Sequence, residues 1–198
     1  MKIENLIEKS YIKPYMDLVH GYDTETYQHS INVAKIACII LEAYPDPIEE
    51  QTKIDTVTGA LLHDIGKTIV PVTIIRKKEP LSKLDHAFIK QHPLNGLRMV
   101  QEEHFGEVIE NIILKHHEKL NGEGYPCQYD MEEIEEPVRI ISVADVYSAL
   151  TEHRSYKRAL NIRDSLMILD KAVRKGELDE VAYDSLVNGL KFSEKFAI

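Results

Sequence analysis

The segment HHEKLNGEGYP, from His116 to Pro126, joins two adjacent histidines to a glycine-rich turn with an aromatic residue. Each imidazole has two ring nitrogens to satisfy, and Ile109, Ile112 and Ile113 put the first histidine on the apolar face of a helix. Binding a ligand would resolve that conflict, and metal coordination is a common use of neutral imidazole. Taken alone, the pair is as compatible with a hydrogen-bonded structural role as with a metal site.

Carboxylates stand beside histidines elsewhere, on segments that are otherwise apolar. His63 and Asp64 directly follow the apolar run VTGALL, so an imidazole and a carboxylate stand side by side at the end of a helix that is expected to be buried. Glu25 and His29 are four residues apart, which places them on one face of a helix. Asp145 lies inside the apolar run IISVADV, where a buried charge needs a cation or several donors. An exposed ion pair remains the structural alternative for Glu25.

Together these residues form a donor set of five histidines and three carboxylates on separate segments. The set comprises Glu25, His29, His63, Asp64, His92, His116, His117 and Asp145. For His92 alone, a core or cap role would be the simpler reading. Imidazole and carboxylate donors without thiolate suit Fe, Mn, Zn or Co. Eight ligands are too many for one ion, so the set predicts two or three metals, which could activate a bridging water and hydrolyse a phosphoester.

The elements that must position these residues read almost entirely as helices, which predicts an all-α fold. Thr24 is the expected N-cap of the long helix that carries His29, Ser82 and Asp85 form an expected capping box, and Gly66 is expected to cap a helix in the left-handed conformation. The expected helical ranges are 3–20 with a break near Pro14, 24–43, 54–64, 82–92, 95–103, 107–117, 137–150, 162–174 and 178–190.

Length, charge and cysteine content restrict the functional class. With 198 residues, the chain is expected to form one domain with its own hydrophobic core. A net charge of −9 argues against DNA or RNA as a partner, because such binding needs clustered lysine and arginine. Two cysteines without a CxxC pair favour a reducing, cytoplasmic setting. We expect no membrane partner, since no apolar run has transmembrane length and the N-terminus lacks a signal-peptide pattern.

Five motifs carry a resemblance to a known family. They are HDIGK, QHP at 91–93, HHExxxGxGYP, VADVYSAL and RSYK at 154–157. In this order they resemble the HD-domain superfamily of metal-dependent phosphohydrolases, and the HHEKLNGEGYP segment narrows the resemblance to the HD-GYP subfamily. The resemblance implies an all-α HD-domain bundle with a multinuclear metal site in its centre. The catalytic core would span 22–160, after an N-terminal helical extension over 1–21 and before a helix pair over 161–198.

The resemblance also implies an activity and roles for particular residues. The activity is hydrolysis of cyclic di-GMP to linear pGpG, to GMP or to both, with two or three divalent ions, most often Fe or Mn. The eight donors named above would be the metal ligands, with Asp64 as the bridge and Glu25 reserved for a third metal. Lys67 would act with Asp64 in catalysis and contact the scissile phosphate. The other substrate contacts implied are Arg154, Lys157, Gly124, Tyr125 and Pro126.

The chain departs from the family pattern around this loop. Asn121 stands where Asp is common, Ser155 stands where Pro is common, and the segment 127–136 is acidic and lacks the usual Gly-Leu turn. These departures keep a second hypothesis open, a phosphohydrolase for another nucleotide or cyclic dinucleotide. A third hypothesis, a non-catalytic binding module, ranks last because its sequence mark would be a loss of ligands and the donor set is intact. The loop at 124–126 could equally contact a protein partner, and the sequence leaves a homodimer open.

Overall fold

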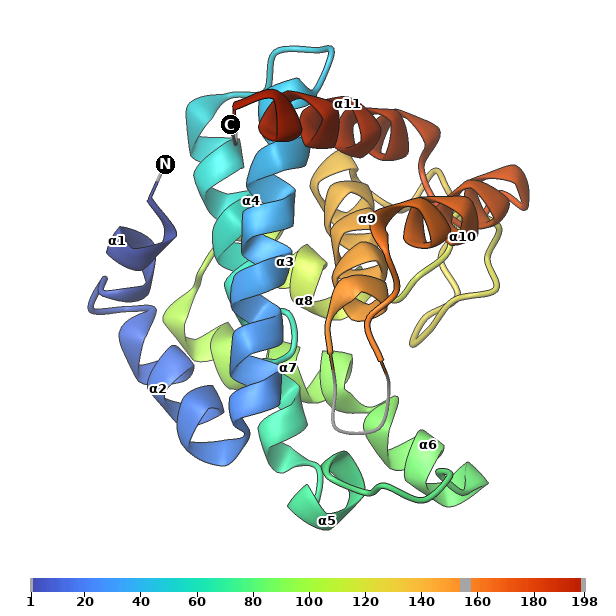
Figure 1. Cartoon of the computed structure of the whole chain (residues 1–198). Helices are drawn as coiled ribbons and strands as arrows, with labels where there is room; N and C mark the ends of the chain where they lie inside the picture. The colour runs from blue at the N-terminus through green and yellow to red at the C-terminus, as the bar shows by residue number, and fades with distance from the viewer. Residues whose placement is uncertain (1, 154–157, 197–198) are drawn as a thin grey trace.

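The computed structural model describes residues 2–153 and 158–196, and these residues form an all-α fold with no strand, as predicted (Figure 1). Arg154 and Lys157, expected to bind substrate phosphates, lie outside the described residues. The helices are α1 Ile3–Ile7, α2 Lys13–Tyr22, α3 Thr24–Ala43, α4 Glu50–Leu62, η1 Ile65–Ile69, α5 Val72–Ile75, α6 Lys83–Ile89, α7 His92–Val100, η2 Gln101–Glu103, α8 Glu107–Lys115, α9 Glu136–Thr151, α10 Ile162–Arg174 and α11 Glu180–Phe196.

The long helix α3 runs through the middle of the bundle and packs against α4, α9 and α11 (Figure 1). Helix α4 packs in turn against α8, and α7 packs against both α8 and η1. Fully buried side chains line these contacts, among them Ile40, Leu61, Ile112 and Ile141. Each contributes about 1.5–3 kcal/mol relative to exposure, which fixes the helices that carry the polar donors. None of the helices described here is both long and apolar enough to cross a lipid bilayer.

Several predicted helix ends are confirmed and others are wrong. The Ser82–Asp85 capping box is present. Asp23 rather than Thr24 caps α3, because its carboxylate accepts a hydrogen bond from the Thr26 backbone N–H at 2.9 Å. Helix α4 starts at Glu50, four residues before the predicted 54. The division of the chain at residues 21 and 160 stays a prediction.

His92 begins a helix instead of ending one. The preceding helix α6 stops at Ile89, and His92 is the first residue of α7, followed by Pro93 in the first turn. A proline fits there because the N–H it lacks would have no partner within the helix. His92 therefore enters the interior from a helix start, with its side chain fully buried.

Gly66 is required for a different reason from the predicted left-handed cap. It lies within η1 and has no positive φ. A Cβ at this position would clash with the backbone carbonyl oxygen of His92 and the backbone nitrogen of Gly96. Gly66 thus allows η1, which follows Asp64 directly, to lie backbone to backbone against α7.

Candidate metal centre

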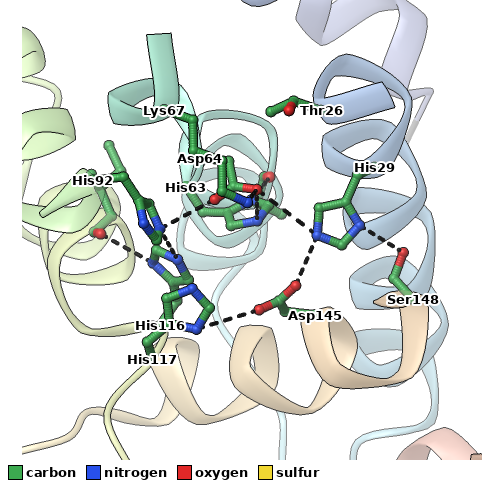
Figure 2. Close-up of polar contacts among 12 residues, drawn as sticks. Thr26, His29, His63, Asp64, Lys67, His92, His116, His117, Asp145 and Ser148 are labelled. Carbon is green, nitrogen blue, oxygen red and sulfur yellow. Dashed lines mark hydrogen bonds and ion pairs between the residues drawn. The ribbon is translucent and has the colours of Figure 1, made fainter. Parts of the chain in front are cut away.

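Seven of the eight predicted donors converge in the interior of the bundle (Figure 2). They come from α3 (His29), the end of α4 (His63 and Asp64), the start of α7 (His92), the end of α8 (His116 and His117) and the middle of α9 (Asp145). Their ligand atoms form two groups that share one carboxylate. The four-residue group is Asp64, His92, His116 and His117, and the three-residue group is His29, His63 and Asp64; within each, the ligand atoms lie within 4.8 Å of one another.

The four-residue group is built around the Nε2 atom of His92. This atom lies 3.2 Å from Oδ1 of Asp64 and 3.1 Å from Nε2 of His116. The ring of His117 packs beside that of His116, with 4.1 Å between centroids. Two ring nitrogens and a carboxylate oxygen thus meet at one point, which is the arrangement that a bound cation would organise.

The three-residue group lies on the other side of Asp64. Its Oδ2 atom is 3.3 Å from Nε2 of His63 and 4.0 Å from Nε2 of His29. The same His29 nitrogen is 2.8 Å from Oδ1 of Asp145, whose Oδ2 lies 3.7 Å from Nδ1 of His117. Asp145 therefore links the two groups. It belongs to neither of them, because membership requires ligand atoms that all lie within 4.8 Å of one another.

The Nδ1 atoms of three imidazoles are held by backbone carbonyls one turn earlier in the chain. His63 Nδ1 lies 2.7 Å from the Ala60 oxygen, and His92 Nδ1 lies 2.7 Å from the Ile89 oxygen. His116 Nδ1 lies 3.1 Å from the carbonyls of both Ile112 and Ile113. A carbonyl can only accept, so Nδ1 carries the proton in each ring and Nε2 keeps its lone pair. Metal-binding histidines show this orientation regularly.

Two buried atoms at the centre have no hydrogen-bond partner among the described residues. They are Nε2 of His63 and Oδ1 of Asp64. Buried polar atoms without a partner are rare in folded proteins, and each carries a free-energy cost of about 1–3 kcal/mol. A divalent cation in each group would give these atoms partners and remove that cost, so the residues present fit metals.

The protonation states of the four-residue group also suit metal binding. Burial lowers the pKa of His92 to about 3 and that of His117 to about 4, and it holds the pKa of His116 well below its usual value. Burial alone would raise the pKa of Asp64, but the charges of Lys67 and His63 outweigh it and hold that pKa well below the usual range. Neutral imidazoles and an ionised carboxylate are the forms that bind metals.

Lys67 connects the centre to an open cavity. Its Nζ lies 2.5 Å from Oδ2 of Asp64, and its side chain and that of His29 both line a cavity of about 970 Å³. Lys77 and Lys78 line another part of the wall, together with residues of α6. An anion in the cavity would therefore meet a cationic side chain directly beside the proposed bridging carboxylate.

Glu25, the eighth predicted donor, is not part of either group. Its side chain is exposed on the cavity wall, one turn before His29 on α3. The other four histidines, His20, His86, His104 and His153, are exposed and also lie outside the groups, in agreement with their omission from the donor set.

Glu152 was missed by the sequence reasoning. Its carboxylate lies 3.0 Å from Nδ1 of His29, and that contact holds its pKa at about 2 although burial opposes the shift. A signal was present in the sequence, since Asp145, Ser148 and Glu152 stand at i, i+3 and i+7 on one face of an apolar helix.

The predicted loop at 124–126 lies against the four-residue group. The Tyr125 ring stacks on His117 with 4.7 Å between centroids, and the Tyr125–Pro126 peptide bond is cis. Gly124 is needed because a Cβ there would clash with the backbone of Glu118 and Lys119. Glu118, which is buried, accepts backbone hydrogen bonds from Cys127 and Gln128 at 2.6 and 3.1 Å. The loop is thus fastened beside the centre and does not line the cavity.

Comparisons with known proteins agree with this arrangement. A family described as "HD domain" matches residues 16–181. A protein named cyclic di-GMP phosphodiesterase from Pseudomonas aeruginosa is 33% identical over 147 residues, which cover 73% of this chain and 34% of that protein. A protein named 3'3'-cGAMP-specific phosphodiesterase 1 from Vibrio cholerae is 32% identical over 162 residues, which cover 82% and 37% respectively. The chain thus spans about a third of the length of these curated relatives.

Solved structures show the same fold. The HD domain of the L. monocytogenes phosphodiesterase PgpH, in complex with cyclic-di-AMP, matches with a TM-score of 0.68 and 19% identity, over 93% of this chain and 98% of that chain. An HDG"Y"P protein from Bdellovibrio bacteriovorus matches with a TM-score of 0.67 and 23% identity, over 82% and 51%.

Proposed function

The chain belongs to the HD-domain family, in its HD-GYP subfamily, and we propose that it is a metal-dependent phosphodiesterase that hydrolyses cyclic di-GMP. The observation that carries the proposal is the pair of donor groups sharing Asp64, with two unpartnered buried atoms at their junction and Lys67 beside them at the cavity. The relatives named as cyclic dinucleotide phosphodiesterases support the same reaction class.

The two donor groups would each hold one divalent ion, with Asp64 bridging. Asp145 would join them from between His29 and His117. Imidazole and carboxylate donors suit Fe or Mn, and a third ion would use Glu25 together with His29. When bound, the ions would act as Lewis acids toward the phosphodiester and make water a stronger nucleophile.

The chain's own residues would bind and orient the substrate. Lys67 would place its ammonium on the scissile phosphate, where a fixed cation stabilises the charge that develops as the bond to the leaving oxygen breaks. The cavity of about 970 Å³ lies at the upper end of the size range of small-molecule pockets, about 300–1,000 Å³, which suits a dinucleotide. Arg154 and Lys157 would hold the phosphates. Tyr125 lies outside the cavity lining, so it would contact only a substrate that extends past the cavity to the ring that stacks on His117. The products would be linear pGpG, GMP or both.

A second candidate substrate is a different cyclic dinucleotide. Relatives named as 3'3'-cGAMP-specific phosphodiesterases are as similar to this chain as those named for cyclic di-GMP. The segment after the loop at 124–126 is also acidic and mostly exposed, so this edge of the molecule differs from the usual family pattern.

One experiment tests both proposals. The full chain is purified anaerobically, its Fe and Mn content is measured per chain, and turnover is followed with cyclic di-GMP, 3'3'-cGAMP, cyclic di-AMP and GMP at equal concentrations. We expect two or three metals per chain and turnover that is highest with cyclic di-GMP. Faster turnover of another cyclic dinucleotide would favour the second candidate. Bound metal without turnover of any of these compounds would overturn both candidates, and failure to bind metal would remove the enzymatic proposal altogether.

A further inference from the structure

The imidazole of His29 is oriented by a side chain, in contrast to the backbone-held imidazoles of the centre. We propose that Glu152 is a positioning residue, whose carboxylate holds Nδ1 of His29 so that Nε2 faces a metal in the three-residue group. The proposal rests on the proposed function, because it assigns a role toward the ion that this group would bind.

The geometry around His29 places a carboxylate on each side of the ring. Oε2 and Oε1 of Glu152 lie 3.0 and 3.2 Å from Nδ1. On the other side, Nε2 lies 2.8 Å from Oδ1 of Asp145. Figure 2 shows the ring between Asp145 and Ser148, whose hydroxyl oxygen is 3.3 Å from Nδ1. The ring is 4% exposed, so water has little access to compete for either nitrogen.

Glu152 is itself held in place by donors from two helices. The Asn32 amide on α3 donates to Oε1 at 2.8 Å, and the Ser148 hydroxyl on α9 donates to the same oxygen. The Glu152 side chain is 15% exposed and directly follows the last turn of α9. These protein donors anchor the carboxylate that contacts the His29 ring.

A fixed carboxylate at Nδ1 has two chemical consequences. It accepts a hydrogen bond from Nδ1–H, which leaves the Nε2 lone pair available to a cation. It also raises the basicity of the ring as a ligand, and loss of such an outer partner typically weakens metal affinity about 10–100-fold. Since Asp145 and Glu152 are both supplied by α9, one helix would set the orientation of His29 and contribute the neighbouring donor.

The first test compares Glu152→Ala and Glu152→Gln in the metal-stripped full chain, with Mn²⁺ binding measured by calorimetry. We expect two sites in the unsubstituted protein. In Glu152→Ala, one site should weaken about 10–100-fold while the other stays within about twofold. Glu152→Gln should lose less, because its amide oxygen can still accept from Nδ1. A suitable control is Asp170→Ala, which removes the partner of the exposed Arg174 on the surface of α10 and should leave both affinities within about twofold.

The second test moves the carboxylate to another position. Ser148→Asp is added to Glu152→Ala, because the residue 148 side chain already approaches Nδ1 of His29. We expect Mn²⁺ affinity at the weakened site to recover to within about fivefold of the unsubstituted value, since Nδ1 regains an anionic acceptor. A role for Glu152 in stability alone predicts a lower melting temperature and no recovery of affinity.

The outcomes separate this inference from the proposed function. If the unsubstituted protein binds no Mn²⁺, the proposed function fails. If it binds Mn²⁺ at two sites and Glu152→Ala binds equally well, only the role of Glu152 is overturned. Should Glu152→Ala fail to fold, Glu152→Met decides, because it keeps the side-chain volume and removes the acceptor. An affinity of that variant within about twofold of the unsubstituted protein at both sites would overturn the inference.

Discussion

The four-residue group and the three-residue group share Asp64 but differ in how one imidazole is held. In the four-residue group, His92 and His116 are oriented by backbone carbonyls one turn earlier in the chain. In the three-residue group, His63 is held in the same way by the Ala60 carbonyl, whereas His29 is oriented by the side chain of Glu152, which directly follows α9. A backbone acceptor survives any substitution at its own residue, whereas a carboxylate can be removed by one.

The two groups also differ in their access to substrate. His29 lines the cavity, and the remaining members of the four-residue group, His92, His116 and His117, do not. The comparison indicates that the backbone-held imidazoles of His63, His92 and His116 form the fixed part of the centre. His29 is the imidazole that lies at the cavity and whose orientation a substitution at its partner can change.

Asp64→Ala is expected to have the largest effect, because this carboxylate is the one member common to both groups. We expect metal content to fall below one ion per chain and turnover to drop at least about 10³-fold. Elemental analysis and a turnover assay on the same sample would measure both. Asp55→Ala, on the preceding helix α4 and outside both groups, serves as the control. A variant with full activity would refute the metal centre as assigned.

Lys67→Met separates chemistry from metal binding. Lys67 contacts Asp64 and faces the cavity, so its loss should lower kcat about 10²–10³-fold by removing a fixed cation from the developing charge. Both metals should remain, since an ammonium is not a ligand. Lys53→Met, which removes a lysine paired with Glu50 on the surface of α4, should retain wild-type kcat. Loss of metal with unchanged kcat per bound metal would assign Lys67 to support of Asp64 instead.

Gly66→Ala tests the fixed part of the centre through its backbone. The added methyl would push against the backbone of His92 and Gly96, so we expect a loss of about 1–3 kcal/mol in the free energy of unfolding and weaker binding at the four-residue group. Gly21→Ala is the matched control, because a Cβ there meets nothing within 4 Å. Because Gly21 is the next-to-last residue of α2, this change should stabilise by at most about 0.5–1 kcal/mol. Equal unfolding free energies in urea for the two variants would contradict the close approach of η1 and α7.

The sequence predicted the donors better than the contacts that orient them. His63, Asp64 and Asp145 were identified because polar residues on apolar helices must find partners inside the fold, and they do. The role of Gly66 depends on where α7 crosses η1, which no local pattern contains. Sequence spacing placed Glu25 on the His29 face, yet the start of α3 lies at the surface, so its side chain is exposed.

Glu152 shows what a local pattern can hide. The helix face shared by Asp145, Ser148 and Glu152 is readable in the sequence, but its meaning depends on the approach of α3, which brings His29 and Asn32 to that face. His92 is a second example. Pro93, which follows it, predicted the end of a helix, but it lies in the first turn of α7. Residue type therefore predicts that a side chain has a partner, and the packing of helices decides which one.

The smallest expected effect is a difference in the pH dependence of stability between the two groups, measured without metal. Burial lowers the pKa of His92 to about 3, so between that value and about 6.5 the unfolded chain binds a proton that the folded chain does not. This histidine therefore makes the free energy of unfolding fall as the pH drops through that window. For His29, burial opposes the shift, but hydrogen bonds to Asp145 and Glu152 raise the pKa above 6.5.

The sign for His29 is the reverse. Its contribution to stability is fully present below pH 6.5 and is lost as the pH rises through the raised folded pKa. Urea unfolding in EDTA between about pH 5 and pH 8 should therefore show a flatter profile for His92→Gln and a steeper loss toward acid for His29→Gln, each by at most about 1.4 kcal/mol per pH unit. Profiles that change in the same direction in both variants would show that the two imidazoles share one electrostatic environment. In that case the backbone and carboxylate partners at Nδ1 would not distinguish the groups.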